Sequence, residues 1–382
     1  MSERLRILVS GMVAGVPGHG GATWAVLQYV LGLERLGHDV WLVEPVANAS
    51  PSSAAYFRAV MNRFALQHRS ALLLDGTTET VGVPYRRLAG AATAADVVIN
   101  IAGMLTDERL LGPAPIRVYL DLDPAFTQLW HTAESIDMRL DGHTHFVTVG
   151  QAIGHPDCAV PTADRHWLGT LPPVSLAHWP RATAPPTLGF TTVGHWRGYG
   201  SVEHGGVHYG QRAHSMRALL PLAARSSESV EPAIAIHAAE KPDLAALAAH
   251  GWRLQDPGVV AATPDRYERF LQDSKGELGV AKSGYVQSQC GWFSDRSACY
   301  LASGRPVIAQ DTGFRPYLPV GLGLLPFRGV DDAFAAIEAV ASDYRAHCDA
   351  ARALAEEHLG SDRVLQSLLE RVSAVPSGAT PA

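Results

Sequence analysis

Short apolar runs alternate with helical patterns along most of the chain. Residues 6–10 form an apolar run, and a helical pattern follows over residues 22–37, in which apolar positions recur every three or four residues. Gly37 is a typical helix stop, and a second apolar run follows directly at residues 38–44. Further runs at residues 71–74, 97–101, 117–120 and 145–149 have the lengths of buried strands. This alternation predicts an α/β fold with a parallel sheet covered by helices on both faces.

A proline-rich segment interrupts the pattern, which then starts again. Five prolines fall between Leu171 and Pro186, and proline fixes the backbone and removes a hydrogen-bond donor. Strands are then predicted at residues 188–193 and 233–237, and helices from about residue 211, after Pro242, and at residues 331–358 and 362–372. We therefore predict two Rossmann-like, doubly wound domains at residues 1–180 and 188–358, a linker at 181–187, and a C-terminal helix and tail at 359–382.

The amino-acid composition argues against a disordered, nucleic-acid-binding or membrane-spanning protein. The 382 residues are 47% hydrophobic and 18% charged, which is too apolar for a disordered chain. The net charge of -6 and the absence of a basic tract give no indication of a nucleic-acid partner. The four cysteines are widely spaced without a C-x-x-C pair, no signal-peptide cleavage site is recognisable, and no apolar run is long enough for a membrane span. We expect a cytoplasmic protein with no transmembrane segment and leave a homodimer open.

A glycine-rich loop, residues 15–21, lies between the first strand and the first helix. Glycines allow a ligand to approach the backbone, and the helix that follows offers free amide groups. A dinucleotide could bind here, with Glu44 on its ribose, but Thr23 replaces the third glycine of that fingerprint and seven residues separate the strand from the motif. A purely structural loop is another interpretation. His19, at the tip of the loop, can serve as a general base.

An acidic pair follows a later predicted strand. Asp121 and Asp123 come at the end of the run 117–120, so they should reach the same edge of the sheet as His19. Either carboxylate can orient an imidazole base. The D-x-D spacing also suits a divalent metal, but the local sequence favours capping of a helix near Pro124, and we predict no metal.

The richest stretch is residues 277–314, which predicts a strand, loop, helix, strand and loop. Ser294 is a good N-cap for the helix, and a capped helix N-terminus after Gly291 suits a phosphate. Asp295 and Arg296 fall in the first turn of that helix, where an acid is also an ordinary choice for the helix dipole. Lys282 follows a predicted strand, where its charge can meet a diphosphate.

Several motifs resemble the GT-B glycosyltransferases. CGWFS, then G-x-P-V-I, then Asp311-Thr312-Gly313 is similar to the donor-sugar half of those enzymes, in particular to the His-Cys-Gly-Trp-Asn-Ser stretch of the family that uses UDP-sugars on small acceptors. The opening VPGHGGATWAVLQYVLGLERLGHDVWLVE is similar to the start of the acceptor half, and the proline-rich linker lies where that fold has its hinge. The resemblance implies two domains that face each other across a cleft.

The resemblance also implies roles for individual residues. It makes His19 the general base and Asp121 its partner, on the acceptor-side loop with Gly18, Gly20, Gly21 and Asp123. It places the donor diphosphate on Gly291 and Ser294, and the sugar hydroxyls near Asp311 and Thr312. The residues themselves add four donor-binding candidates in the second half: Arg197, Lys282, Asp295 and Arg296. Two positions depart from the pattern, because Gln289 stands where the family has a diphosphate-binding His and Cys299 where it commonly has a ribose-binding acid. Asp295 and Arg197 are the expected substitutes.

The implied reaction moves a sugar from a UDP- or dTDP-sugar to a hydroxyl of a small molecule or glycan. The pair of glutamates eight residues apart that is typical of retaining GT-B enzymes is absent, which favours inversion without a metal or other cofactor. Alternatives remain a nucleotide-sugar epimerase or phosphorylase, a non-catalytic GT-B-like binding protein, and an NAD- or flavin-dependent oxidoreductase.

Overall fold

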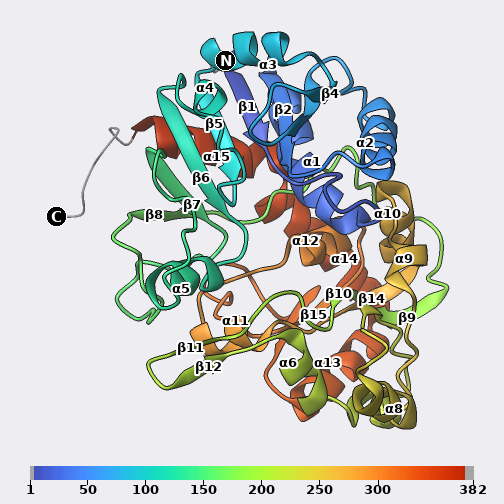
Figure 1. Ribbon diagram of the computed structural model, residues 1–382. Helices are drawn as coiled ribbons and strands as arrows, with labels where there is room; N and C mark the ends of the chain where they lie inside the picture. Colours follow the sequence, from blue (N-terminus) through green and yellow to red (C-terminus); the bar gives the residue numbers. More distant parts are fainter. Residues whose placement is uncertain (1–3, 375–382) are drawn as a thin grey trace.

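The computed structural model describes residues 4–374, which form two α/β halves (Figure 1). The sheet of the first half has the order β4-β3-β2-β1-β5-β6-β7-β8, and every neighbouring pair is parallel except β3 with β4. Its strands are β1 (Arg6–Ser10), β2 (Asp39–Val46), β3 (Ser70–Leu74), β4 (Thr80–Gly82), β5 (Val97–Ile101), β6 (Ile116–Asp121), β7 (His145–Thr148) and β8 (Trp167–Gly169). The predicted parallel sheet is confirmed, and β4 and β8, three residues each, were not predicted.

Five helices accompany this sheet: α1 (Gly20–Arg35), α2 (Pro51–Arg63), α3 (Tyr85–Thr93), α4 (Glu108–Leu111) and α5 (Phe126–Thr132). Local signals account for some of their starts. Pro51 opens α2, and the Ser50 side chain caps that helix by accepting from Ser53 N. Residues 170–187 then run from the first sheet to the second.

The second half has a four-stranded parallel sheet and a short extension. The main sheet has the order β16-β15-β14-β9, and β10 pairs in parallel with β13. The strands are β9 (Leu188–Thr191), β10 (Val193–His195), β13 (Ala233–Ala235), β14 (Ser274–Gly279), β15 (Val307–Gln310) and β16 (Leu324–Phe327). The strand predicted at residues 188–193 is thus two strands that break at Thr192. The glycine-rich stretch after β10 contains a hairpin that was not predicted, β11 (Val202–His204) with β12 (Val207–Tyr209).

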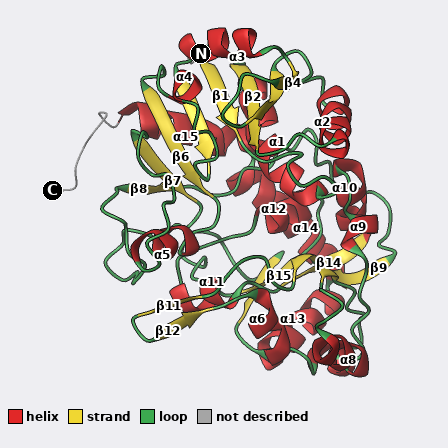
Figure 2. Ribbon diagram, viewed as in Figure 1, coloured by secondary structure: helices red, strands yellow, loops and turns green. Residues whose placement is uncertain are grey.

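Figure 2 shows how helices surround this second sheet. They are α6 (Arg212–Ala218), α7 (Leu222–Arg225), α8 (Lys241–Ala249), α9 (Pro257–Val260), α10 (Pro264–Asp273), α11 (Ser283–Ser288), α12 (Asp295–Ala302), α13 (Val330–Ser342) and α14 (Tyr344–Leu354). The helix predicted at residues 331–358 is interrupted, because Asp343 ends α13 and its side chain caps α14. The mixed α/β fold class is confirmed.

The C-terminal helix returns to the first half. After a π-helical turn at Ala355–Leu359, α15 (Ser361–Ala374) packs along α1, where a Cβ on Gly32 would lie 2.5 Å from Leu365. Arg35 and Asp362 form an exposed ion pair across this contact. The predicted tail, residues 375–382, lies outside the described residues. Among residues 4–374, no helix is long and apolar enough to cross a membrane.

The two halves share one hydrophobic core on the α1 side. It runs from Ile7 in β1 to Leu301 in α12, and Trp179 is fully buried between Trp24 and Tyr267. Hydrogen bonds cross the same contact, from Gly20 N to Ala261 O (2.8 Å) and from the Trp24 indole N–H to the Pro264 carbonyl (3.0 Å). This contact, between α1 and residues 261–267, therefore holds the two halves together.

The two halves approach each other very closely at Gly20. A Cβ at this position would lie 2.3 Å from the Thr263 carbonyl oxygen, and a backbone atom cannot move aside cheaply. We expect Gly20→Ala to lower the free energy of unfolding by about 1–3 kcal/mol, the usual cost of overpacking. Gly90→Ala is the matched control, because that helical position is open and alanine should stabilise it by about 0.5–1 kcal/mol. Urea unfolding of both variants is the measurement, and equal stability of Gly20→Ala and the parent would contradict the prediction.

Candidate active site

A cavity of about 1560 Å³ lies between the two halves. The first half contributes the loop of residues 16–19, one face of α1, and Asp123 after β6. The second half contributes the ends of β10 and β13, residues 254–258, Arg212, Lys282 and the start of α12. The cavity thus lies where parallel strands end and helices begin, which is the usual place for ligands in α/β folds.

His19 lines this cavity, as predicted from the sequence. It is the N-cap residue of α1 without a capping side-chain bond, and its ring has no hydrogen bond to any described residue. His195, at the end of β10, faces it from the other half, with the ring centroids 5.3 Å apart. Burial, followed by the neighbouring His19, lowers the pKa of His195, so His195 is neutral at neutral pH. The His19 imidazole, which has no hydrogen bond to a described residue, is therefore free to contact a ligand in the cavity.

The loop that carries His19 is shaped by Glu44. The Glu44 carboxylate is fully buried and accepts hydrogen bonds from Ala14 N (2.8 Å) and Gly15 N (2.5 Å). Its two oxygens are therefore bound to the protein's own backbone, which corrects the alternative interpretation in which Glu44 binds a ribose. Gly20 and Gly21 likewise face the second half, because a Cβ on Gly21 would lie 2.8 Å from Tyr267. Gly18 lines the cavity and has a positive φ of 88°.

Glu44→Ala should separate loop positioning from donor binding. Loss of the carboxylate leaves the amides of Ala14 and Gly15 without their partner, and the His19 loop can then shift. A displacement of about 1 Å at a reacting group costs on the order of 10²-fold in rate. We expect kcat of the sugar transfer that the sequence resemblance implies to fall by about that factor, while nucleotide affinity stays within about twofold, measured by steady-state kinetics and calorimetry. A weaker nucleotide affinity with unchanged kcat would contradict this role.

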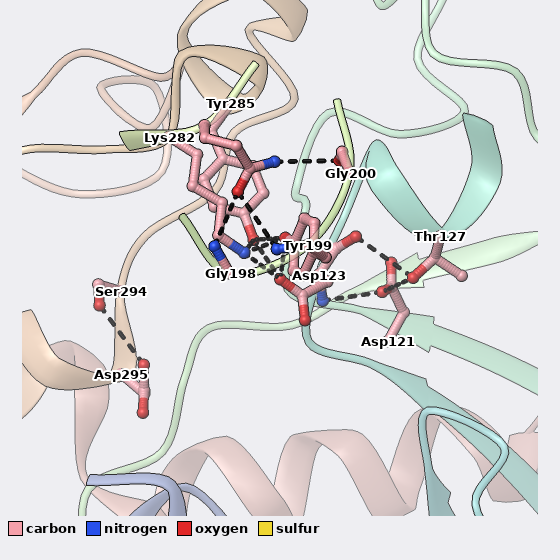
Figure 3. Close-up of polar contacts among 11 residues, drawn as sticks. Asp121, Asp123, Thr127, Gly198, Tyr199, Gly200, Lys282, Tyr285, Ser294 and Asp295 are labelled. Atoms are coloured by element: carbon pink, nitrogen blue, oxygen red, sulfur yellow. Dashed lines mark hydrogen bonds and ion pairs between the residues drawn. The ribbon is translucent and has the colours of Figure 1, made fainter. Parts of the chain in front are cut away.

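Asp121 is not brought into contact with His19. Its carboxylate is buried and accepts hydrogen bonds from Thr127 Oγ1 (2.7 Å) and Asp123 N (3.0 Å) (Figure 3). Gln128 Nε2 (2.9 Å) and Thr148 Oγ1 (2.8 Å) also donate to it. The structure therefore shows no His19–Asp121 pair, and Asp121 does not line the cavity. Its contacts fix the start of α5 against β6 and β7. They do so through side chains and not by capping, because the N-cap residue of α5 is Ala125, which has no capping side-chain bond.

Asp123 lines the cavity and bridges the two halves. Its Oδ1 accepts from Lys282 Nζ (2.9 Å), Tyr199 Oη (2.6 Å) and Tyr285 Oη (2.6 Å), all from the second half (Figure 3). Burial raises the pKa of Asp123, but Lys282 and the two hydroxyls outweigh it, so the net pKa is lowered and the carboxylate is ionised. Lys282, predicted to meet a diphosphate, is thus paired with a carboxylate here. The two Asp side chains do not converge on one point as a D-x-D metal site requires.

The start of α12 reaches the cavity as predicted. Ser294 caps this helix by accepting from Arg296 N (3.2 Å), and Ser294, Asp295 and Arg296 all line the cavity. Arg296 is also bound to the fully buried Glu277 through Nε and Oε1 at 2.5 Å, so its charge is partly neutralised. Burial raises the pKa of Asp295, the expected substitute for a ribose-binding acid. Arg197 lines the cavity and forms an ion pair with Glu240.

Other predicted donor residues lie behind the cavity wall. Gly291 adopts a positive φ of 78° and packs against Gln151 and Ala152. Asp311 is buried and paired with Arg328, and the Thr312 hydroxyl donates to the Trp292 carbonyl. Gly291, Asp311 and Thr312 therefore support neighbouring loops in this structure and do not line the cavity.

The two replaced family positions also point away from the cavity. Gln289, in a left-handed conformation, donates to the carbonyls of Val286 and Asp311. Cys299 is buried against α1 and accepts from Gln28 Nε2 (3.4 Å). Asp295 therefore offers a carboxylate to the cavity where Cys299 does not.

Sequence reasoning missed Arg212, the first residue of α6. Its side chain lines the cavity and is buried, yet its Nε and Nη1 have no hydrogen-bond partner among the described residues. Burial and the nearby Arg296 lower the pKa of Arg212 to about 9. A buried guanidinium without a partner is costly, so this part of the cavity wall is suited to an anion. No motif surrounds Arg212, and only its burial identifies it.

Comparisons with known proteins find similarity in structure alone. No family model and no curated protein matches the sequence. An α-glucosyltransferase solved with UDP-glucose and DNA containing an abasic site has a TM-score of 0.61 at 12% identity, covering 97% of this chain and 100% of that one. HepE from Anabaena, solved with UDP and glucose, has a TM-score of 0.58 at 10% identity, covering 97% and 100%.

A third solved structure extends the comparison. AviGT4, a glycosyltransferase involved in avilamycin A biosynthesis, has a TM-score of 0.57 at 13% identity, covering 98% of this chain and 99% of that one. In all three comparisons the matched part covers 97% or more of this chain, so the likeness extends over both halves. The fold of this chain is therefore the GT-B fold that these glycosyltransferases have.

Proposed function

We propose that the protein is a glycosyltransferase that moves a sugar from a nucleoside diphosphate sugar, such as a UDP- or dTDP-sugar, to a hydroxyl of a small molecule or glycan. The observation that carries this proposal is Arg212, a buried cation without a partner that faces the cavity beside the start of α12. Unpaired amides at a helix N-terminus and a guanidinium are both suited to a diphosphate. The shared fold with enzymes solved with UDP or UDP-glucose supports the same ligand class.

In the proposed reaction, His19 removes the proton from the acceptor hydroxyl. The oxygen forms a bond to the anomeric carbon while the bond between that carbon and the diphosphate oxygen breaks, which inverts the anomeric centre. The electron pair leaves with the nucleoside diphosphate, and Arg212 together with the amides of α12 stabilises its added negative charge. No metal is needed in this scheme because these groups supply the positive charge.

We also propose a cytoplasmic location and an acceptor other than nucleic acid. The four cysteines are free thiols in the structure, which suits a reducing compartment. The net charge of -6 is unfavourable for binding a polyanion, although the α-glucosyltransferase of similar fold was solved with DNA. A retardation assay with duplex DNA at low salt checks this, and saturable binding would contradict it.

The test of the main proposal is a donor panel. UDP, dTDP, GDP and ADP, and the glucose conjugate of each, are titrated calorimetrically, and bound donors are incubated with mixed acceptors in EDTA. We expect one nucleotide to bind, a product of one added hexose by mass spectrometry, and an anomeric configuration opposite to the donor's by NMR. A new sugar nucleotide without acceptor would indicate an epimerase, and no nucleotide binding would contradict the proposal.

A further inference from the structure

The Asp123 carboxylate has one oxygen that the protein leaves open. Lys282, Tyr199 and Tyr285 all bind the same atom, Oδ1, at 2.9, 2.6 and 2.6 Å. Oδ2 has no hydrogen-bond partner among the described residues, and 44% of the Asp123 side chain is exposed. Figure 3 shows one oxygen of Asp123 within this cluster and the other directed away from it. The carboxylate is thus fixed from one side and offers an acceptor atom to the cavity.

The groups behind Asp123 keep it in this position. Lys282 is bound both to Asp123 and to the Tyr199 hydroxyl, and its ammonium also lies 3.6 Å from the centre of the Tyr199 ring. Phe126 and Trp130 pack edge-on against that ring, at centroid distances of 4.9 and 4.6 Å. Side chains held this firmly lose little freedom when a ligand binds, so the open oxygen is pre-oriented.

An indole lies beside this carboxylate in the same cavity wall. Trp292 is half-buried, lines the cavity with Asp123, and stacks on Tyr285 with ring centroids 4.2 Å apart and an angle of 22°. Its backbone is fixed by a bridge to Gly150 and by the Thr312 hydroxyl on its carbonyl. Because Tyr285 also binds Asp123, the indole and the carboxylate are held by one shared residue.

We propose that Asp123 and Trp292 form a sugar subsite, in which Asp123 Oδ2 accepts hydrogen bonds from ring hydroxyls and Trp292 packs against the C–H face of the ring. A sugar combines these two surfaces, since its hydroxyls lie at the edge and its C–H groups on the faces. This inference rests on the proposed function and adds the residues that hold a sugar. Asp123 comes from the first half and Trp292 from the second, so the subsite is complete only when the halves meet as they do here.

Asp123→Asn and Trp292→Ala test the subsite in different ways. The amide oxygen of Asn can keep the contacts of Oδ1 while its NH₂ replaces the open acceptor with a donor, and Trp292→Ala removes the apolar surface. Asp157→Asn is the matched control, because Asp157 is almost fully exposed and lies outside the cavity lining. Thermal unfolding confirms that each variant is folded before its binding is measured.

The probes separate the two possible sources of the sugar. UDP alone, UDP-glucose, and free glucose, galactose or N-acetylglucosamine at saturating UDP are each titrated calorimetrically. We expect both variants to bind UDP within about twofold of the parent and to lose about tenfold or more in affinity for a sugar-bearing probe. A loss confined to UDP-glucose assigns the subsite to the donor sugar, and a loss confined to a free sugar assigns it to a carbohydrate acceptor.

Two outcomes would contradict the proposed sugar subsite. Either the parent protein gains no affinity from the glucose of UDP-glucose and binds no free sugar, or both variants bind every sugar as the parent does. Failure of the proposed function looks different: the parent then binds no nucleotide. In that case the free sugars are titrated without UDP, and their loss in both variants would still establish the subsite.

Discussion

Replacement of His19 by alanine should strongly reduce the rate of sugar transfer and leave donor binding almost intact. His19 lines the cavity and has no hydrogen bond from its ring to any described residue, so the proposed reaction is the role that remains for it. Loss of a general base typically costs about 10²- to 10⁴-fold in rate. We expect kcat to fall within that range and the dissociation constant for the nucleotide, measured by calorimetry, to change by less than about twofold.

The controls for this variant are an exposed histidine and added imidazole. His68 is exposed and lies outside the cavity lining, so His68→Ala should keep the parent's kcat. Imidazole in solution can enter the space left by the ring and should restore part of the rate of His19→Ala, which a purely structural role would not allow. Retained turnover with lost nucleotide binding would place His19 on the donor and contradict its role as base.

The periodicity of the chain predicted most of the first sheet, because buried parallel strands and amphipathic helices leave strong local patterns. The strands β1, β2, β5, β6 and β7 and the helix α1 lie where the sequence placed them. The hairpin β11–β12 escaped prediction because its strands have three residues each within a glycine-rich segment. Its neighbour Tyr199 was missed for the same reason, although it holds Asp123.

The site was harder to predict because the decisive contacts join distant segments. Asp121 and Asp123 are equivalent by sequence, since both follow the same apolar run. Packing of α5 decides between them: Thr127 and Gln128 enclose Asp121, while Asp123 lies beyond the strand and meets Lys282, 159 residues later. A local pattern cannot show which carboxylate is enclosed by its own helix and which one faces the other domain.

Arg212 was not predicted because one arginine among many, outside any motif, carries no local signal. Its position depends on three structural features that the sequence indicates only weakly. They are the break between β9 and β10, the β11–β12 hairpin, and the start of α6. Together they bring its guanidinium next to Gly194, where a Cβ would lie 2.0 Å from Nη1. The absence of a side chain at Gly194 is thus what lets Arg212 reach the cavity.

Replacement of Arg212 by methionine should weaken nucleotide binding and, at the same time, stabilise the unliganded protein. The buried Glu277 carboxylate is paired with Arg296, whereas Nε and Nη1 of Arg212 have no hydrogen-bond partner among the described residues. Burial lowers the pKa of Arg212 to about 9, below its value in the unfolded chain, so at neutral pH the folded state carries the cost of a charged group that the unfolded state solvates freely. That cost should decrease as the pH rises through about 9.

Methionine fills a similar volume without a charge or an unsatisfied donor. We therefore expect Arg212→Met to raise the free energy of unfolding by about 1–3 kcal/mol at pH 7, the usual cost of an unsatisfied buried polar group. The variant should also bind UDP about 10- to 150-fold more weakly, because a hydrogen bond to a charged group contributes about 1.5–3 kcal/mol. Urea unfolding without ligand and calorimetric titration with UDP measure the two effects.

The matched control is Arg225→Met, because Arg225 lies on the surface of the same half and pairs with the exposed Asp331. Its replacement should change the free energy of unfolding by less than about 0.5 kcal/mol and leave UDP binding unchanged. Opposite signs of the two effects in Arg212→Met are the distinctive result, since a merely structural arginine would lose stability when removed. A destabilised Arg212→Met with normal UDP affinity would show that the guanidinium holds the fold and that the anion binds elsewhere.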